Sequence, residues 1–514
     1  MSRASRQGGE RSSFPVLLLA LVALPGVLVA LPVAYALIRS FDAGFSTLIA
    51  ELLRPTSLEL LVTTLELALS VTLLTLVMGI SAAWVTERCD LPHASLWRVI
   101  ASAPLAMPAF VSSYAWASLG PAYQGMAGAI MILSLACMPL IYLPVAAALR
   151  GTDPSFEDVA RSLGHGPFKT FWLIILPQIW PAMMGGALLV SSHMLAEFGA
   201  LSFLRVQTFT TAIFQQYEMQ FDNATAALFS LVLMGLSMPL ALFEQHLRHG
   251  RRRSRSGKGA ARSPIIIKLG LWRWPVLILF AAFAVLAIGV PFATLFYWLI
   301  SGSSAGMGTE RLLPALLGSL SYSLSGGLLT TLLAIPLVLA SLRMSGVLIE
   351  LADRLPYAIH GLPGLVIALS LIFFSIRYVP GLYQSPLLVL LAYVMLFLPL
   401  AQSSIRASAE LVQPELENVA RSLGRGPLAA FAEVTLPNLL PGLGASLALV
   451  VLQLMRELTA TLLLAPSGVV TLATEFWSFT NDRAYAAAAP FAAALVIISG
   501  VPVYVFTLRT LRRD

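Results

Sequence analysis

Long apolar runs dominate this chain and restrict what it can fold into. Of its 514 residues, 58% are hydrophobic and only 11% are charged, whereas a soluble domain carries about 25% charged residues. So much apolar surface cannot be buried in a water-soluble core, and the runs lack the alternation of membrane barrel strands. We therefore predict an all-α integral membrane protein with about 12 transmembrane helices, because each span needs about 20 apolar residues. The expected spans are 14–38, 58–85, 97–120, 127–149, 180–204, 224–246, 274–300, 316–342, 356–376, 386–405, 440–465 and 486–508.

Two of these runs differ from the rest. The first is longer than the apolar region of a secretory signal, which is about 7–15 residues, so we expect a retained span. The ninth contains Gly361, Pro363 and Gly364, residues that packed membrane helices tolerate.

Lysine and arginine predict the orientation. With the N-terminus inside, 25 of them lie in cytoplasmic segments and 6 lie outside, and such a bias orients membrane proteins. Both termini are therefore expected in the cytoplasm. The basic stretch 248–273 is interpreted as a cytoplasmic linker that anchors topology in contact with membrane lipid. A lipid-binding role is the alternative, and no nucleic-acid partner is expected.

A repeated polar motif divides the chain into two halves. Residues 157–164 read EDVARSLG and residues 417–424 read ENVARSLG, and each copy leads to a Leu-Pro pair that ends at Pro177 or Pro437. The offset is 260 residues throughout this region. We predict parallel repeats related by a pseudo-two-fold axis along the membrane normal. Residues 1–247, an extra span plus a five-helix core, and 274–514 form the two halves.

Each copy of the repeated segment reads as a short surface helix. Asp153 is a suitable N-cap, Pro154 suits the first helical position, and Glu157 lies in the first turn. The helix is expected to run to Leu163, with a turn at Gly164 and a second short helix ending at Pro177. A helix of this kind enters a groove on a soluble partner. The alternative is an ordinary loop, which two matching copies disfavour.

These motifs resemble the signature of the membrane subunits of binding-protein-dependent ABC importers: Glu-Ala-Ala, three residues, Gly, nine residues, Ile-x-Leu-Pro. Both copies keep the glycine, the spacing and the Leu-Pro pair, but the acid of the motif becomes Asp158 and Asn418, with Glu157 and Glu417 one place earlier. The resemblance implies coupling helices that dock into two copies of a cytoplasmic ABC ATPase. The residues to which it assigns this coupling are Glu157, Asp158, Ala160, Arg161, Gly164, Pro177, Glu417, Asn418, Ala420, Arg421, Gly424 and Pro437.

The sequence contains no recognisable nucleotide-binding, catalytic or metal-binding motif. It lacks a G-x-x-x-x-G-K-[ST] phosphate loop, and no catalytic or metal constellation stands out. The resemblance therefore places ATP and magnesium on the partner subunits, and no cofactor is expected on this chain. Cys89 and Cys137 are interpreted as inert thiols.

The fused layout resembles the ferric-iron group of these importers. The segments that carry this resemblance are 195–200 (LAEFGA), 208–213 (TFTTAI) and 456–464 (RELTATLLL). Thiamine and aminoethylphosphonate permeases share the layout and remain alternatives. The resemblance implies an inner-membrane permease of a bacterium that receives substrate from a periplasmic binding protein.

Charged residues inside the spans suggest a pathway. Glu197 and Glu457 are equivalent in the two halves, and intramembrane carboxylates commonly face a cavity. Oxygen ligands suit a hard cation, so the pair is a candidate pathway site, with Arg456 as a neutralising neighbour and Glu66 as a further candidate. A hydrogen-bond network between helices is the alternative for each, and His193 and His360 are interpreted as packing residues.

Two other classes of protein fit the pattern of spans. An ion-gradient-driven secondary transporter also has twelve spans in parallel halves, and a membrane scaffold needs no pathway. The doubled cytoplasmic motif favours the importer.

Overall fold

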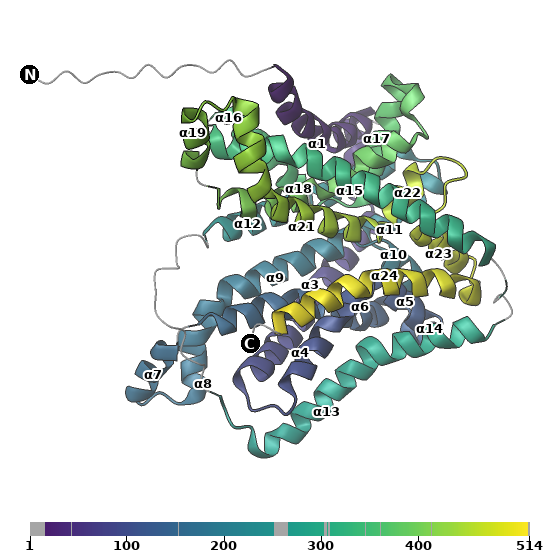
Figure 1. Cartoon of the computed structure of the whole chain (residues 1–514). Coiled ribbons are helices and arrows are strands. Elements are labelled where there is room, and N and C mark those ends of the chain that lie inside the picture. Colours follow the sequence, from purple (N-terminus) through teal and green to yellow (C-terminus); the bar gives the residue numbers. More distant parts are fainter. Residues whose placement is uncertain are drawn as a thin grey trace, which may run out of the picture.

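The computed structural model describes residues 16–42, 44–152, 154–250, 266–302, 306, 309–344, 346–359, 361–412 and 414–511. Over these ranges the chain is helical, with a single isolated bridge between Cys89 and Ile267 in place of any strand. The helices lie roughly along one direction in two stacked groups (Figure 1). The predicted all-α membrane architecture is confirmed.

Within the described ranges, eight helices are long and apolar enough to cross a membrane, or ten if each of two bent pairs counts as one span. Two further apolar helices are shorter, Gly364–Tyr378 and Tyr485–Gly500. Together these segments correspond to the twelve predicted runs. The eight long helices are Pro55–Arg88, Gly125–Arg150, Phe171–Ala196, Asn223–Phe243, Gly270–Ile300, Thr309–Arg343, Pro386–Ala409 and Phe431–Leu454.

Two of the predicted runs are broken at equivalent places. The run 97–120 forms α4 (Ala94–Ser102), η1 (Ala103–Ala106) and α5 (Ala109–Ala117), with an 87° bend. The run 356–376 is divided between α16 (Val347–Ile359) and α17 (Gly364–Tyr378). Pro108 and Pro363 each stand at the break, immediately before the second helix. A proline disfavours the helical conformation at the residue before it, so the chain turns there.

The two halves repeat the same order of helices. In the first half, α3 (Pro55–Arg88), α6 (Gly125–Arg150), α9 (Leu176–Ala196), α10 (Gly199–Leu204), α11 (Phe209–Glu218) and α12 (Asn223–Gly250) follow one another. Their counterparts are α15 (Leu312–Arg343), α18 (Pro386–Ala409), α21 (Leu436–Leu454), α22 (Thr459–Leu464), α23 (Leu472–Asn481) and α24 (Tyr485–Leu511). The proposed linker lies mostly in 251–265, outside the described residues.

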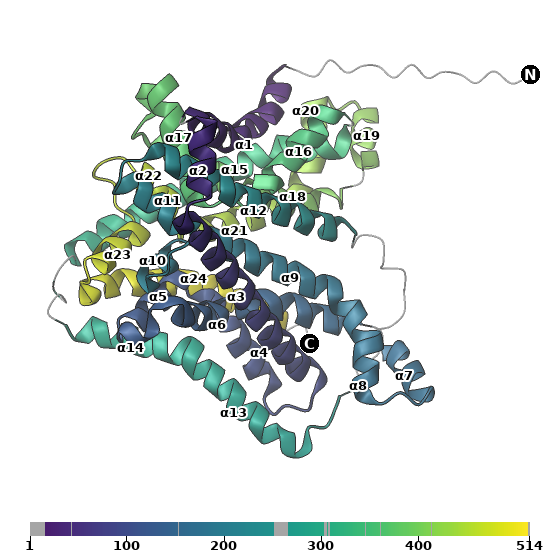
Figure 2. The same ribbon diagram turned by 180° about the vertical axis from the view of Figure 1, so that it is seen from behind.

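The N-terminal helices of each half also pack against helices of the other half. The first helix, α1 (Val16–Asp42), leads through a sharp bend into α2 (Phe45–Leu52) and packs on α15, α16 and α17 of the second half. The helices α13 (Arg273–Ala284) and α14 (Val290–Ile300) are joined by the π-turn η6 (Val285–Gly289), and they pack on α4 and α5 of the first half. Figure 2 shows α1 beside α15 to α17, with α13 and α14 along the opposite side. The halves are therefore interlocked.

Small residues allow the core helices to approach closely. A side chain at Gly79 of α3 would lie 2.9 Å from the Ile141 side chain of α6, and one at Gly186 of α9 would lie 3.1 Å from the Ile141 backbone. In the second half, a side chain at Gly326 of α15 would lie 2.6 Å from the ring of Tyr393 in α18. Close backbone approach is the usual way in which membrane helices associate.

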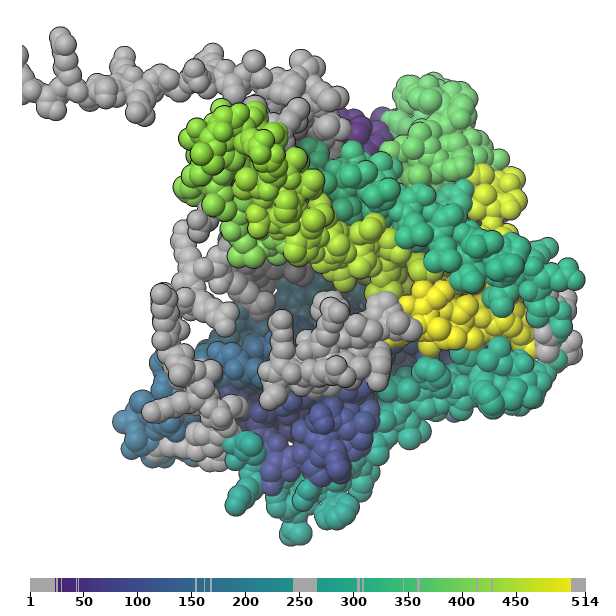
Figure 3. Space-filling model, viewed as in Figure 1, coloured from purple at the N-terminus to yellow at the C-terminus, as the bar shows by residue number. Residues whose placement is uncertain are grey.

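The repeated polar segments form two short helices, α7 (Pro154–Ser162) and α19 (Pro414–Ser422). Both lie at the same end of the bundle, on the left in Figure 1, and they stand out as separate blue and green projections in Figure 3. Gly164 and Gly424 follow them with φ values of 80° and 86°, a left-handed conformation that suits glycine. As predicted, Glu157 lies in the first turn, while the helix ends at Ser162, one residue before the expected Leu163. Asp153 lies outside the described residues.

The expected second short helix does not end at Pro177. Instead, α8 (Pro167–Thr170) continues through the π-turn η3 (Phe171–Ile175) into α9, and Pro177 occupies the first turn of α9. The second half repeats this with α20 (Pro427–Ala430), η9 (Phe431–Thr435) and α21, which contains Pro437. A π-turn changes the hydrogen-bond spacing, so the helix can continue past a proline that lacks an N–H group. Each surface helix is therefore connected directly to a membrane helix.

Candidate coupling helices and central cavity

The first carboxylate of each repeat forms an ion pair with an arginine of the same half. Arg88, the last residue of α3, lies 2.9 Å from Glu157 of α7 between Nη1 and Oε1. Arg343, the last residue of α15, lies 2.6 Å from Glu417 of α19 between Nη2 and Oε1. Glu417 also accepts a hydrogen bond from Thr435. Both carboxylates are thus engaged by their own half.

Electrostatics around Glu417 favour its ionised form. Burial alone, the largest influence, raises the pKa of this carboxyl, but hydrogen bonds from Thr435 and Arg343 and the positive charges of Arg343 and Arg421 outweigh it and hold the pKa below its usual range. The ion pair on α19 is therefore a charged one at neutral pH.

An apolar stripe lies on the outer face of each surface helix. In the first half it consists of Phe156 and Val159 of α7 and of Leu163 just past the end of that helix, whose exposed fractions are 55%, 56% and 69%. The equivalent residues of the second half are Leu416 and Val419 of α19 and Leu423 just past its end, which are 46%, 57% and 79% exposed. In each copy the first two residues, spaced i, i+3, share one helix face and the third follows in the turn, an arrangement similar to the apolar anchors of helices that bind a groove.

The other predicted coupling residues divide by exposure. Ala160 is buried and Ala420 is half-buried, so both face the body of the protein. Asp158, Asn418 and Arg421 are exposed, while the Arg161 side chain lies outside the described residues.

A cavity of about 770 Å³ lies between the two halves. Its walls come from α5, α6 and α9 of the first half and from α16, α18 and α21 of the second. Pro108, Glu197 and Glu457 line one part of it, and Arg406 and Glu410, at the end of α18 that leads to α19, line another. The cavity therefore extends toward the end of the bundle that carries α7 and α19.

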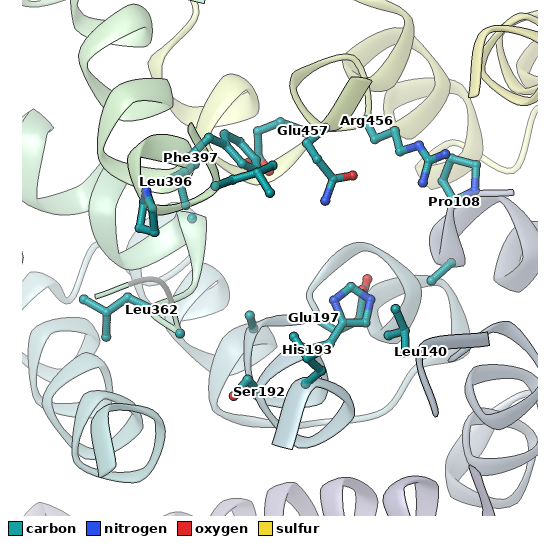
Figure 4. A pocket seen from close by; sticks show the side chains of 18 of the residues that line it. Pro108, Leu140, Ser192, His193, Glu197, Leu362, Leu396, Phe397, Arg456 and Glu457 are labelled. Atoms are coloured by element: carbon teal, nitrogen blue, oxygen red, sulfur yellow. The ribbon is translucent and has the colours of Figure 1, made fainter. Parts of the chain in front are cut away.

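The two candidate pathway carboxylates are equivalent in structure as well as in sequence. Glu197 accepts a hydrogen bond from the Ala200 N–H at 2.9 Å, where the chain breaks between α9 and α10. Glu457 accepts one from the Ala460 N–H at 2.7 Å, at the matching break before α22. A carboxylate bound to the first turn of a helix stabilises that turn. Both side chains line the cavity from opposite sides (Figure 4).

The neighbours of these carboxylates differ between the halves. His193 lies 3.5 Å from Glu197 between Nε2 and Oε2, whereas Gln453 takes the equivalent position in the second half. Arg456 lines the cavity and donates from Nε to the Ser499 hydroxyl at 2.9 Å.

The remaining candidates lie elsewhere. The Glu66 side chain is exposed on α3 and does not line the cavity, and His360 lies outside the described residues. Cys89 and Cys137 are free and buried, and burial raises the pKa of the Cys89 thiol to about 11, with a smaller contribution from Asp90. In the part of the chain that the structure describes, no three His, Cys, Asp or Glu side chains could hold a metal ion together.

Aromatic side chains that the sequence did not single out pack together next to the cavity. Phe110, which lines the cavity, and Tyr114 belong to α5 of the first half, and they lie 5.5 and 5.1 Å from the ring of Phe476 in α23. Phe203 of α10 packs on the same ring at 5.8 Å. Phe476 is fully buried. These rings form a seam between the halves on the side of the cavity away from α7 and α19.

Comparison with known proteins agrees with this duplicated architecture. Residues 94–253 and 333–511 each match the family of binding-protein-dependent transport system inner membrane components. The chain belongs to this family. It is therefore a multi-pass membrane subunit of an inner-membrane transport system, a permease and not an enzyme.

Individual relatives of this permease differ in how much of it they cover. The Fe(3+)-transport system permease protein FbpB 2 of Haemophilus influenzae is 44% identical over 494 residues, 95% of this chain and 97% of that protein. The molybdenum transport system permease protein ModB of Escherichia coli is 26% identical over 198 residues, 34% of this chain and 86% of that protein. A probable sulfate transport system permease protein, cysT of Chlorokybus atmophyticus, is 25% identical over 229 residues, 40% of this chain and 80% of that protein. The last two relatives are thus about the size of one half.

Proposed function

We propose that this permease carries ferric iron across the inner membrane to the cytoplasm in an ATP-driven importer. The observation that carries the proposal is the 44% identity to a Fe(3+)-transport permease over 95% of the chain. The fused arrangement of two family segments supports it, since the two smaller relatives match only about half of the chain. A periplasmic binding protein delivers the iron, and both termini, α7 and α19 face the cytoplasm.

Two copies of a cytoplasmic ATPase supply the energy, one docked on α7 and one on α19. The matching stripes of exposed apolar side chains support this proposal, because a soluble partner with a hydrophobic groove would bury the same three positions twice. ATP and magnesium are bound by these partners. Closure of the ATPase pair draws together the two helical hairpins, α7 with α8 and α19 with α20. The motion passes into α9 and α21, which continue α8 and α20 without a break.

The central cavity is the pathway in its inward-facing state. Its extension toward α7 and α19 and the aromatic seam at its other end support this assignment. Glu197 and Glu457 meet the passing cation with the carboxylate oxygens that do not bind the Ala200 and Ala460 N–H groups. Oxygen ligands suit a hard cation. Two such groups bind a cation weakly, as passage through the pathway requires.

Docking is tested by placing a charge in each stripe. The double variant Val159→Asp/Val419→Asp should lose co-purification with the ATPase and lose uptake of radiolabelled ferric iron, because a desolvated carboxylate disfavours an apolar groove. The matched control is Val379→Asp, which places the same charge at an exposed apolar residue outside both surface helices and should retain the complex. An intact complex in the double variant would refute docking through the stripes.

The substrate is tested by uptake in a strain that lacks the permease gene. Radiolabelled ferric iron should accumulate only when the gene is restored, while thiamine and aminoethylphosphonate should not. Uptake that continues without ATP and stops when the ion gradient collapses would favour a secondary transporter instead.

A further inference from the structure

We propose that Arg88 and Arg343 are positioning residues that couple the two surface helices to the first core helix of each half. This inference rests on the proposed docking of α7 and α19 on an ATPase. Each arginine is the last residue of its helix, α3 or α15, and each binds the first carboxylate of a repeat.

In the first half the arginine joins three elements. Besides its ion pair with Glu157, Arg88 donates from Nη2 to the Leu149 carbonyl oxygen at 3.2 Å and to the Thr152 hydroxyl. Leu149 lies in the last turn of α6, and Thr152 precedes α7. One guanidinium thus holds the ends of α3 and α6 together with the start of α7.

In the second half the arginine makes the equivalent ion pair but has a different further partner. Arg343 binds Glu417 of α19 and donates from Nη2 to the Thr435 hydroxyl at 3.4 Å, in the π-turn that leads to α21. The end of α15 is therefore tied to both arms of the hairpin. The ion pair between the end of the first core helix and the surface helix is thus present in both halves, which argues that it has a function.

The physical basis is the cost of separating a desolvated ion pair. The Arg88 and Glu157 side chains are 1% and 6% exposed, so moving α7 away from α3 would leave two uncompensated buried charges. The pair consequently resists separation, and a displacement of α7 by a partner also displaces α3. In this arrangement Glu157 acts through Arg88, and the exposed Asp158 is the acid that remains available to a partner.

The two connections differ in strength. The Arg343 and Glu417 side chains are 44% and 20% exposed, and solvent screens an exposed pair more strongly. We therefore expect α7 to be held more rigidly against α3 than α19 is held against α15.

The test uses paired neutral variants, because a single change would leave one buried charge without a partner. Arg88→Met/Glu157→Leu and Arg343→Met/Glu417→Leu are each assembled with the ATPase and the binding protein in proteoliposomes. Co-purification, ATP hydrolysis and iron uptake are measured together. The control is Arg354→Met/Glu350→Leu, which removes an exposed pair on α16.

The expected result is a retained complex that still hydrolyses ATP but transports less iron for each ATP. The loss should be on the order of tenfold for the Arg88 pair, a typical size for coupling between sites, and smaller for the Arg343 pair. Unchanged uptake per ATP in both variants would overturn the inference, and so would loss of the complex, which would make these residues part of docking. Failure of the unmodified chain to bind an ATPase would instead defeat the proposed function.

Discussion

The hydroxyl of Tyr114 donates a hydrogen bond to the carbonyl oxygen of Tyr485 at 2.6 Å, and so joins α5 of the first half to the start of α24 in the second. The ring of Tyr114 also packs edge-on against Phe476. Trp298 of α14 lies 5.5 Å from the Tyr485 ring and donates to the Ser118 hydroxyl at 2.9 Å. These contacts join the two halves on the side of the cavity away from the surface helices, and we expect an outward-facing state to break them.

Tyr114→Phe should shift the permease toward its outward-facing state. The change removes one hydrogen bond between the halves, worth about 1 kcal/mol, which corresponds to a roughly fivefold change in the balance of states. We expect basal ATP hydrolysis by the assembled importer to rise by that factor without binding protein. The control is Tyr142→Phe, whose hydroxyl bonds to Thr86 within the first half. Equal basal rates in the two variants would contradict this role for Tyr114.

Phe476→Ala should open the aromatic seam. Removing a buried phenylalanine costs about 3–5 kcal/mol in soluble proteins, and here the lost contacts lie between the halves. We expect a lower unfolding temperature and leakage of small solutes through proteoliposomes. Phe479→Ala is the control, because Phe479 stacks on Phe491 within the second half. A tight membrane with Phe476→Ala would show that other contacts seal the pathway.

Substitution of both Glu197 and Glu457 by glutamine or by alanine distinguishes the helix-capping role of these side chains from the role of their charge. A glutamine oxygen can still accept the Ala200 and Ala460 N–H bonds, whereas alanine removes each cap at a cost of about 1 kcal/mol. We expect the glutamine double variant to assemble with normal thermal stability but to import iron more slowly. The alanine double variant should also be less stable. Normal uptake by the glutamine variant would leave these residues with a structural role only.

The ion pair on α19 should resist mild acid. Because the pKa of folded Glu417 is below its usual range, the stabilisation is present above the ordinary glutamate pKa of about 4.3 and is lost as pH falls through the lower folded value. The infrared carboxylate band that disappears in Glu417→Gln should therefore titrate below about pH 4.3. In Arg343→Met its midpoint should rise. A midpoint that Arg343→Met leaves unchanged would contradict the assignment of this arginine as a stabilising partner.

Much of the fold followed from local sequence. The twelve apolar runs correspond to the eight long helices, the two bent pairs and the two shorter helices. The helices α7 and α19 begin at the expected prolines and are followed by the expected glycines. A hydropathy profile contains no information on changes of direction, however, so it gave no prediction of the bends at Pro108 and Pro363. The expected helix end at Pro177 was wrong.

The candidate site was only partly accessible to the same reasoning. Glu197 and Glu457 were found by their equivalence, and both line the cavity. Glu66 was also intramembrane by sequence, but its face of α3 is exposed. Which side of a helix meets a cavity depends on the neighbouring helices, and hydropathy carries no record of that. Tyr114 and Phe476 gave no signal, because aromatic residues in apolar runs are common.

The sequence by itself determined the environment, the duplication and the two surface helices, since these depend on composition, on a repeated string and on residues that start and stop helices. Only the tertiary structure decided which groups meet. Arg88 and Arg343 bind equivalent carboxylates although they are 255 residues apart, not 260. A difference of five residues in helix length and loops is enough to hide such a pair from alignment, and packing brings the two charges to the same place in each half.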